Sequence, residues 1–139
     1  MRLVKQLHRH LPDQGIYGDC ARTVIACLLD LDPEDVPHAH RELAAGEQQE
    51  MHDAFLLDRG ILRISIPVQI AEIEKALEWG AYYAKGMPYV LAGTSRTGVN
   101  HVVIAHGREI IWDPSLTDAG IIGPCDDGLY WFELLVRPL

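Results

Sequence analysis

The order of the periodic segments predicts an α+β fold, in which N-terminal helices pack on an antiparallel β-sheet. Apolar residues recur at helical spacing in the first half of the chain, whereas short apolar or alternating runs follow in the second half. No repeat, linker or low-complexity segment divides the sequence. We therefore expect one domain over residues 1–139, a length that can bury a core without disulfides or metal.

Three helices are expected before residue 61. The clearest runs from Cys20 to Asp30, with Asp19 as its N-terminal cap. A short helix begins at Asp32-Pro33, where the proline suits the first turn. The third spans residues 47–59 and stops at Gly60, a residue typical of helix ends. Its apolar stripe consists of Met51, Ala54 and Phe55.

The apolar period then changes to two, which predicts strands. Residues 62–68 alternate, and Pro67 indicates that this strand lies at a sheet edge or that the proline is near the strand's end. Ile70, Ile73 and Leu77 indicate one more helix, ending between residues 80 and 86. Further strands are expected at residues 89–92, 101–105 and 109–113 and within 129–136. The middle runs are apolar at every position, so we expect both faces of those strands to be covered.

Composition excludes several classes of function. The net charge of −8 repels polyanions and argues against nucleic acid as a partner. No apolar run reaches the roughly 18 residues of a membrane span, and the first residues lack the apolar core of a secretory signal. We therefore expect no membrane partner. Three cysteines, an odd number, favour a reduced cytoplasmic setting over a disulfide framework.

The candidate nucleophile is Cys20, at the first turn of the clearest helix. The positive end of the helix dipole and the unpaired N–H groups there favour a thiolate. The same N–H groups can hold an oxyanion, and the side-chain amide of Gln14 could supply a second donor. Alone, however, a free cysteine is more often a small buried apolar residue.

The candidate base and its orienting group are His101 and Asp113. The Gly107-Arg108 turn signal joins two apolar runs into a hairpin. If the turn centres on Gly107, His101 faces Asp113, with Cβ atoms about 5 Å apart, and a one-residue slip leaves them diagonal. The carboxylate can then hold one imidazole nitrogen and leave the other free to act as a base.

The remaining polar candidates are weaker. Ser95 and Arg96 lie in a polar loop before His101 and could touch a substrate. His52 is a distant second choice for the base. The other cysteines and paired histidines are interpreted as core, loop or surface residues, because none has typical zinc-ligand spacing. They are Cys27, Cys125, His8, His10, His38 and His40.

Three features of the sequence resemble the papain-like cysteine peptidase superfamily. They are Gln14 ahead of Cys20 at a helix start, the strand that opens with His101, and the segment Trp112-Asp113-Pro114. The nearest branch is that of the compact bacteriocin-processing (double-glycine leader) peptidase domains and their small bacterial and phage relatives. The resemblance covers residues 14–31 and 99–120, about a third of the chain. It implies a minimal papain-like fold. Cys20 would be the nucleophile, His101 the general base and acid, Asp113 the orienter and Gln14 the oxyanion donor.

Two departures from the family limit what the resemblance carries over. No tryptophan follows Cys20, where papain has one, because Arg22 and Thr23 occupy those positions. The chain also lacks the length for the second lobe that forms papain's cleft. The substrate rules of papain therefore do not transfer to this sequence.

The expected function is that of a thiol hydrolase that cleaves a peptide, isopeptide or related amide bond through an acyl-enzyme on Cys20. The substrate is a peptide or protein, and no cofactor or metal is expected. Deamidation or transglutaminase-type transfer would use the same residues. A zinc site formed by Cys20, His101 and Asp113 is another alternative, although Gln14 would be superfluous in it. A non-catalytic binding module on the same fold stays open.

Overall fold

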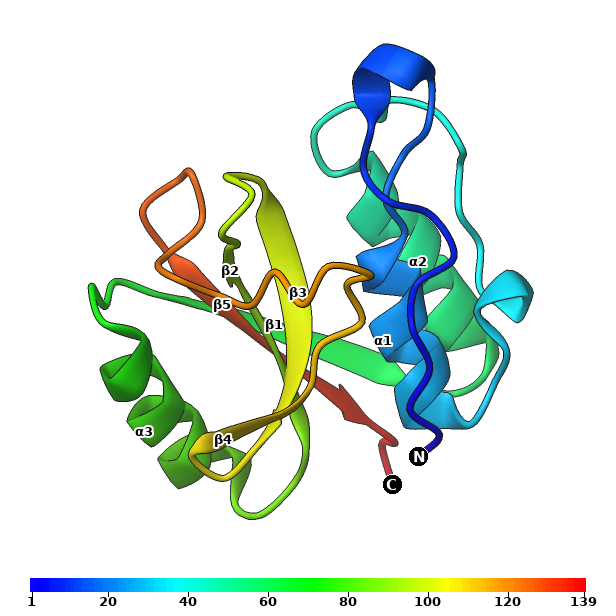
Figure 1. The fold of residues 1–139 in the computed structure, drawn as a ribbon. Helices are drawn as coiled ribbons and strands as arrows, with labels where there is room; N and C mark the ends of the chain where they lie inside the picture. Colours follow the sequence, from blue (N-terminus) through cyan, green and yellow to red (C-terminus); the bar gives the residue numbers. More distant parts are fainter.

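A five-stranded antiparallel sheet with the order β1-β5-β2-β3-β4 lies at the centre of the computed structural model, which describes residues 1–139 (Figure 1). The fold is α+β, as the sequence predicts. The strands are β1 (Leu62–Val68), β2 (Tyr89–Thr94), β3 (Asn100–His106), β4 (Glu109–Trp112) and β5 (Tyr130–Val136). The edge position of β1 confirms the expectation based on Pro67.

Helices cover both faces of the sheet. On one side lie α1 (Cys20–Leu29) and α2 (Glu47–Asp58), with the N-terminal segment alongside them, and α3 (Ile73–Ala84) lies on the other (Figure 1). Two 3₁₀ turns, Pro12–Gln14 and Pro33–Asp35, complete the elements. Alternate residues of β2 and β3 pack in opposite directions, Leu91 and Val103 with the α3 core and Val90 and Ile104 with α1. This arrangement confirms that both faces are covered.

Asp19 does not cap α1 with its side chain, which corrects the expectation. Its carboxylate instead accepts hydrogen bonds from the backbone N–H groups of Leu7 (3.2 Å) and His8 (2.8 Å) and from Nε of Arg22 (2.9 Å). The physical reason is that the N-terminal segment supplies donors that compete with those of the helix. Asp19 thereby ties residues 7 and 8 to the start of α1.

The buried face of α2 also differs from the predicted stripe. His52 and Leu56 are its buried residues, whereas Ala54 is exposed and Met51 and Phe55 are only half-buried. His52 faces the segment after the second 3₁₀ turn, because its Nε2 lies 2.9 Å from the carbonyl oxygen of Pro37. A polar contact thus sets the rotation of this helix. None of the helices has both the length and the hydropathy required to cross a bilayer.

Candidate active site

Cys20 is the first residue of α1, and its side chain is half-buried. The helix is fixed against the sheet because Val24 and Cys27 pack on Val90 and Ile104. That contact holds the N-terminal end of α1 beside the beginning of β3, which carries His101. The thiol therefore lies in the positive field of a helix N-terminus, close to an imidazole.

His101 and Asp113 form the hydrogen bond that the sequence predicts. His101 Nε2 lies 2.7 Å from Asp113 Oδ1, and the ring is 7% exposed. The carboxylate also accepts the backbone N–H groups of Ser115 (2.9 Å) and Gly120 (2.8 Å). Three donors therefore hold Asp113 in place, and Nδ1 of His101 is left for the thiol side.

The hairpin that carries this pair has a different register from the expected one. Ala105 pairs with Ile110 rather than with Glu109, and a bulge then places Ile104 opposite Trp112. Relative to the predicted register, the two-residue turn shifts the strand pairing by one position, and the bulge shifts it by one more. The predicted register is wrong, yet the side chains still meet because Asp113 follows the end of β4 and is held by the loop after it.

The electrostatics of the site favour a protonated His101 ring. Burial by itself lowers the pKa of His101, but hydrogen bonding to Asp113, then to Cys20, and the negative charges of both raise that pKa to about 9. Burial likewise opposes ionisation of Asp113, yet the hydrogen bonds from His101 and from two backbone N–H groups hold its pKa well below the usual range. The ring is therefore stabilised in its protonated form.

Cys20 and His101 border two cavities. The first cavity, of about 520 Å³, lies between α1, α2 and the sheet. The second cavity, of about 470 Å³, lies against the N-terminal segment and the loop after Asp113. Both volumes fall in the range of ligand sites. A chain-like substrate could thus extend to either side of the thiol.

Gln14 is not brought to this pair. It is exposed on the first 3₁₀ turn and borders neither cavity. The reason is that Leu11 and Ile16 pair with each other, so the intervening residues project as a loop at the end of the molecule (Figure 1).

Another glutamine, Gln6, borders the second cavity together with Cys20 and His101. It is 8% exposed, and its Nε2 donates to the carbonyl oxygen of His8 (2.7 Å), while its Oε1 has no partner. Its backbone N–H donates to Pro114 O (2.8 Å). Sequence reasoning missed Gln6 because no periodic element contains it, and no local signal marks it.

The two weaker candidates have mainly structural contacts. Ser95 borders the second cavity, but its hydroxyl is bonded to Thr97 Oγ1 (2.8 Å) and Val99 O (3.1 Å). Arg96 borders neither cavity and donates to the carbonyl oxygens of Asp118 and Ala119 (3.0 Å to the latter). Arg96 therefore supports the loop that holds Asp113 rather than a substrate.

The other thiols and the second-choice base have environments unlike that of Cys20. Burial raises the pKa of Cys27, and burial with Asp127 and Asp126 raises that of Cys125 to about 11, although Cys125 borders the first cavity. Burial lowers the pKa of His52 to about 4, and His52 borders neither cavity. None of these groups can replace the Cys20–His101 pair.

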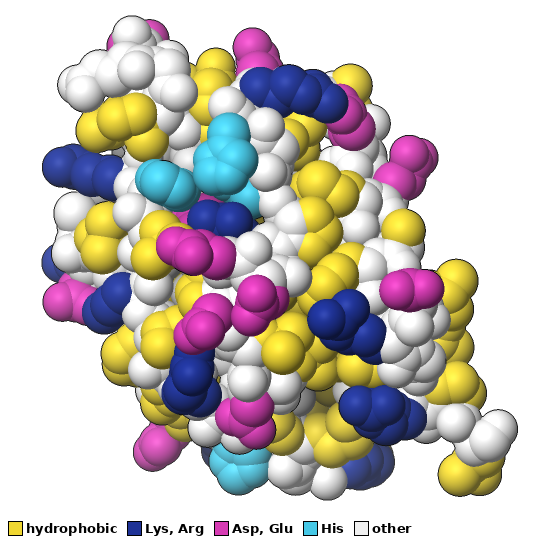
Figure 2. Space-filling model, turned by 90° about the vertical axis from the view of Figure 1, so that its right-hand side faces the viewer, with side chains coloured by type: hydrophobic (Ala, Val, Ile, Leu, Met, Phe, Trp, Pro, Cys, Tyr) yellow, Lys and Arg dark blue, Asp and Glu magenta, His cyan; other side chains and the backbone are white.

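Three of the paired histidines, His8, His38 and His40, gather on the side of the molecule that carries the helices (Figure 2). Their ring centroids are 4.4–6.1 Å apart. No three His, Cys, Asp or Glu side chains converge in a geometry that could hold a metal ion.

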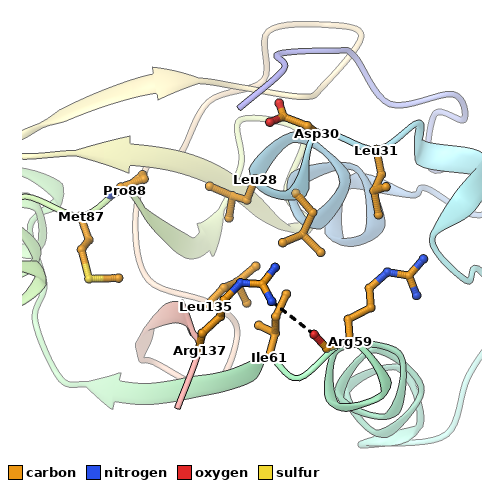
Figure 3. Close-up of a pocket in the computed structure, with 10 residues that line it drawn as sticks. Leu28, Asp30, Leu31, Arg59, Ile61, Met87, Pro88, Leu135 and Arg137 are labelled. Carbon is orange, nitrogen blue, oxygen red and sulfur yellow. Dashed lines mark hydrogen bonds between the residues drawn. The ribbon is translucent and has the colours of Figure 1, made fainter. Parts of the chain in front are cut away.

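A third cavity, of about 690 Å³, lies elsewhere, at the C-terminal end of α1 (Figure 3). Leucines and isoleucine form much of its wall, with Arg59 and Arg137 at its side. It contains no cysteine, histidine or serine, so it offers no nucleophile with a base.

Comparison of the chain with protein-family models, curated proteins and solved structures finds no match. The chemistry of the site therefore has to be argued from its geometry.

Proposed function

We propose that the protein is a thiol-dependent hydrolase of the papain-like type, which cleaves a peptide, isopeptide or related amide bond through an acyl-enzyme on Cys20. The observation that carries this proposal is the 2.7 Å hydrogen bond between His101 and Asp113 at the N-terminal end of the cysteine-bearing helix. Its setting would be the cytoplasm, where the three free cysteines stay reduced.

The reaction follows from the contacts of the three residues. The Cys20 thiolate attacks the carbonyl carbon, and the protonated His101 ring gives its proton to the leaving amine. A water molecule, deprotonated by His101, then hydrolyses the thioester. Asp113 keeps the ring oriented throughout and stabilises its charge.

The oxyanion would be held by the backbone N–H of Cys20 and the side-chain amide of Gln6. The first N–H groups of a helix have no intrahelical acceptor. One N–H of the Gln6 amide donates to His8 O, which orients the amide and leaves its second N–H for substrate. Gln6 takes the role that sequence reasoning gave to Gln14.

The same geometry argues for acyl transfer over a zinc site. Asp113 already accepts three hydrogen bonds, and the Nε2 of His101 is bound to it. A shared metal ion would have to break these contacts. Deamidation or transfer to an amine uses the same residues and differs only in the groups admitted beside Cys20.

Alkylation of the folded protein by iodoacetamide near neutral pH tests the proposal. We expect fast, selective modification of Cys20, mapped by peptide mass spectrometry, and a large loss of rate in His101→Ala. His106→Ala is the matched control, because His106 is an exposed histidine at the other end of the same strand. Equal rates and pH profiles in the wild type and His101→Ala would refute the pair.

A further inference from the structure

The first cavity has an unbalanced set of charges. Among the residues that border it, the carboxylates are Asp53, Asp127 and Glu133, and the only lysine or arginine is Arg63. The Arg63 side chain is 5% exposed and is already engaged by Asp53 (2.7 Å) and Glu133 (3.4 Å). The cavity therefore keeps an excess of negative charge beside the nucleophile.

Glu133 is the carboxylate with the strongest need for another partner. Its side chain is 17% exposed, and only Oε2 contacts Arg63, so Oε1 receives no hydrogen bond from the chain. Burial raises the pKa of Glu133 in spite of that arginine. For a half-buried carboxylate that is only half-paired, a cation placed beside Oε1 would offset part of the cost of burial.

The surface between Cys20 and Glu133 is apolar. In the sheet register, Val90 lies opposite Glu133, and Ala92 lies between Trp131 and Val102. The Trp131 indole is fixed because its Nε1 donates to Asp127 Oδ2 (2.8 Å). An aliphatic stem can lie on these side chains, and a cation is attracted to an indole face.

The distance suits a long side chain. Glu133 is on β5, and His101 is on β3, with β2 between them. Glu133 lies level with Ile104, three residues along β3 from His101. Two strand spacings across the sheet and three residues along β3 each amount to about 10 Å, so the two backbone positions are about 14 Å apart. A lysine or arginine side chain beside the reacting carbonyl and the Glu133 side chain can cover this span together, whereas a short polar side chain cannot.

From these contacts, and resting on the proposed function, we infer that the first cavity selects peptide substrates with a basic residue next to the bond attacked by Cys20. The methylene stem lies over Ala92 and Trp131, and the cationic head pairs with Glu133. Asp127 and Asp53 add to the attraction from the rim.

The test uses three tripeptide vinyl sulfones that differ only in the residue beside the electrophile: lysine, norleucine or glutamate. The Cys20 thiolate adds to the vinyl carbon β to the sulfone, which carries the peptide, and the carbon α to the sulfone takes the proton of His101. We expect the lysine probe to react at least tenfold faster than the norleucine probe, as charged hydrogen bonds allow, and the glutamate probe to be slowest.

Glu133→Gln should reduce the lysine-to-norleucine ratio about tenfold while the rate with iodoacetamide, which has no side chain to place, stays the same. Glu109→Gln, an exposed change on β4, is the matched control and should keep the ratio. Equal rates for the lysine and norleucine probes, or an unchanged ratio in Glu133→Gln, would overturn the inference.

Binding of the corresponding peptide amides to the Cys20→Ala variant, followed by tryptophan fluorescence, separates the two proposals. A lysine preference there, with slow iodoacetamide labelling of the wild type, would reject the hydrolase and keep the basic subsite. Fast labelling of Cys20 without a lysine preference would reject the subsite alone.

Discussion

The two ends of helix α1 carry the same residue type in opposite environments. At the N-terminal end, Cys20 is half-buried beside His101 and borders two cavities. Two turns later, Cys27 is fully buried against β2 and β3, with Val4 N–H 3.4 Å from its sulfur. Beyond it lies the leucine-lined cavity of Figure 3.

This difference teaches that membership of one helix does not set the environment of a thiol. Both thiols belong to one helix and are seven residues apart. The two thiols differ in the part of the sheet and of the N-terminal segment that each contacts. Only the beginning of β3 supplies an imidazole, and Asp113 holds that imidazole in place.

Replacement of each cysteine by alanine should give the largest difference between the two ends of α1. Cys20→Ala should abolish alkylation and turnover and leave the fold intact, because only a half-buried sulfur is lost. Cys27→Ala should keep Cys20 fully reactive but lower the free energy of unfolding by about 1–2 kcal/mol through a small cavity. Labelling kinetics and urea denaturation check both results, and loss of Cys20 reactivity in Cys27→Ala would contradict the comparison.

Asp113→Asn should come next, with a fall in the rate of Cys20 acylation of about 10²–10⁴. An amide cannot stabilise the imidazolium and would favour the wrong tautomer. Single-turnover kinetics with an activated ester measures this. Asp118→Asn is a control, since Asp118 is an exposed carboxylate in the same loop. Similar rates for both variants would remove Asp113 from the mechanism.

The two glutamines offer a sharper test of the N-terminal end. Gln6→Ala should lower the turnover rate by about 10–10³, as loss of an oxyanion donor does, with little change in iodoacetamide labelling. Gln14→Ala should leave both rates unchanged, because Gln14 is exposed outside both cavities. The reverse result would restore the assignment made from sequence.

The pH dependence of stability should show the smallest effect. The pKa of His101 is raised to about 9, above its unfolded value of about 6.5. Its contribution is therefore fully present below pH 6.5 and is lost as the pH rises through 9. We expect unfolding free energy to fall by about 1–3 kcal/mol over this window. The fall should be absent in His101→Ala. A parallel decline in that variant would point to other groups.

Much of the fold could be predicted because it is encoded locally. Alternation, as in residues 62–68, is typical of a strand with one covered face, and the continuous apolar runs at 89–92 and 101–105 are typical of strands covered on both faces. The structure has strands in all three ranges. The stripe on α2 was less informative. His52 is polar and yet fully buried, with its Nε2 in contact with Pro37 O and its Nδ1 without a partner.

The site was predictable in part for the same reason. Cys20 at a helix start and His101 and Asp113 on one hairpin are short-range features, and they tolerate an error in register because neighbouring positions lie within reach. The position of Gln6, the proposed oxyanion donor, was not predictable. Gln6 reaches the cavity through a backbone bond to Pro114, a contact across 108 residues.

The sequence by itself determined the order of helices and strands and the pairing of an imidazole with a carboxylate, because periodicity and hairpin closure act over a few residues. Only the tertiary structure decided that Gln6 rather than Gln14 borders a cavity with Cys20, that Asp19 ties down the N-terminal segment, and that Glu133 borders the cleft. These choices depend on how distant segments pack, and no local pattern records that packing.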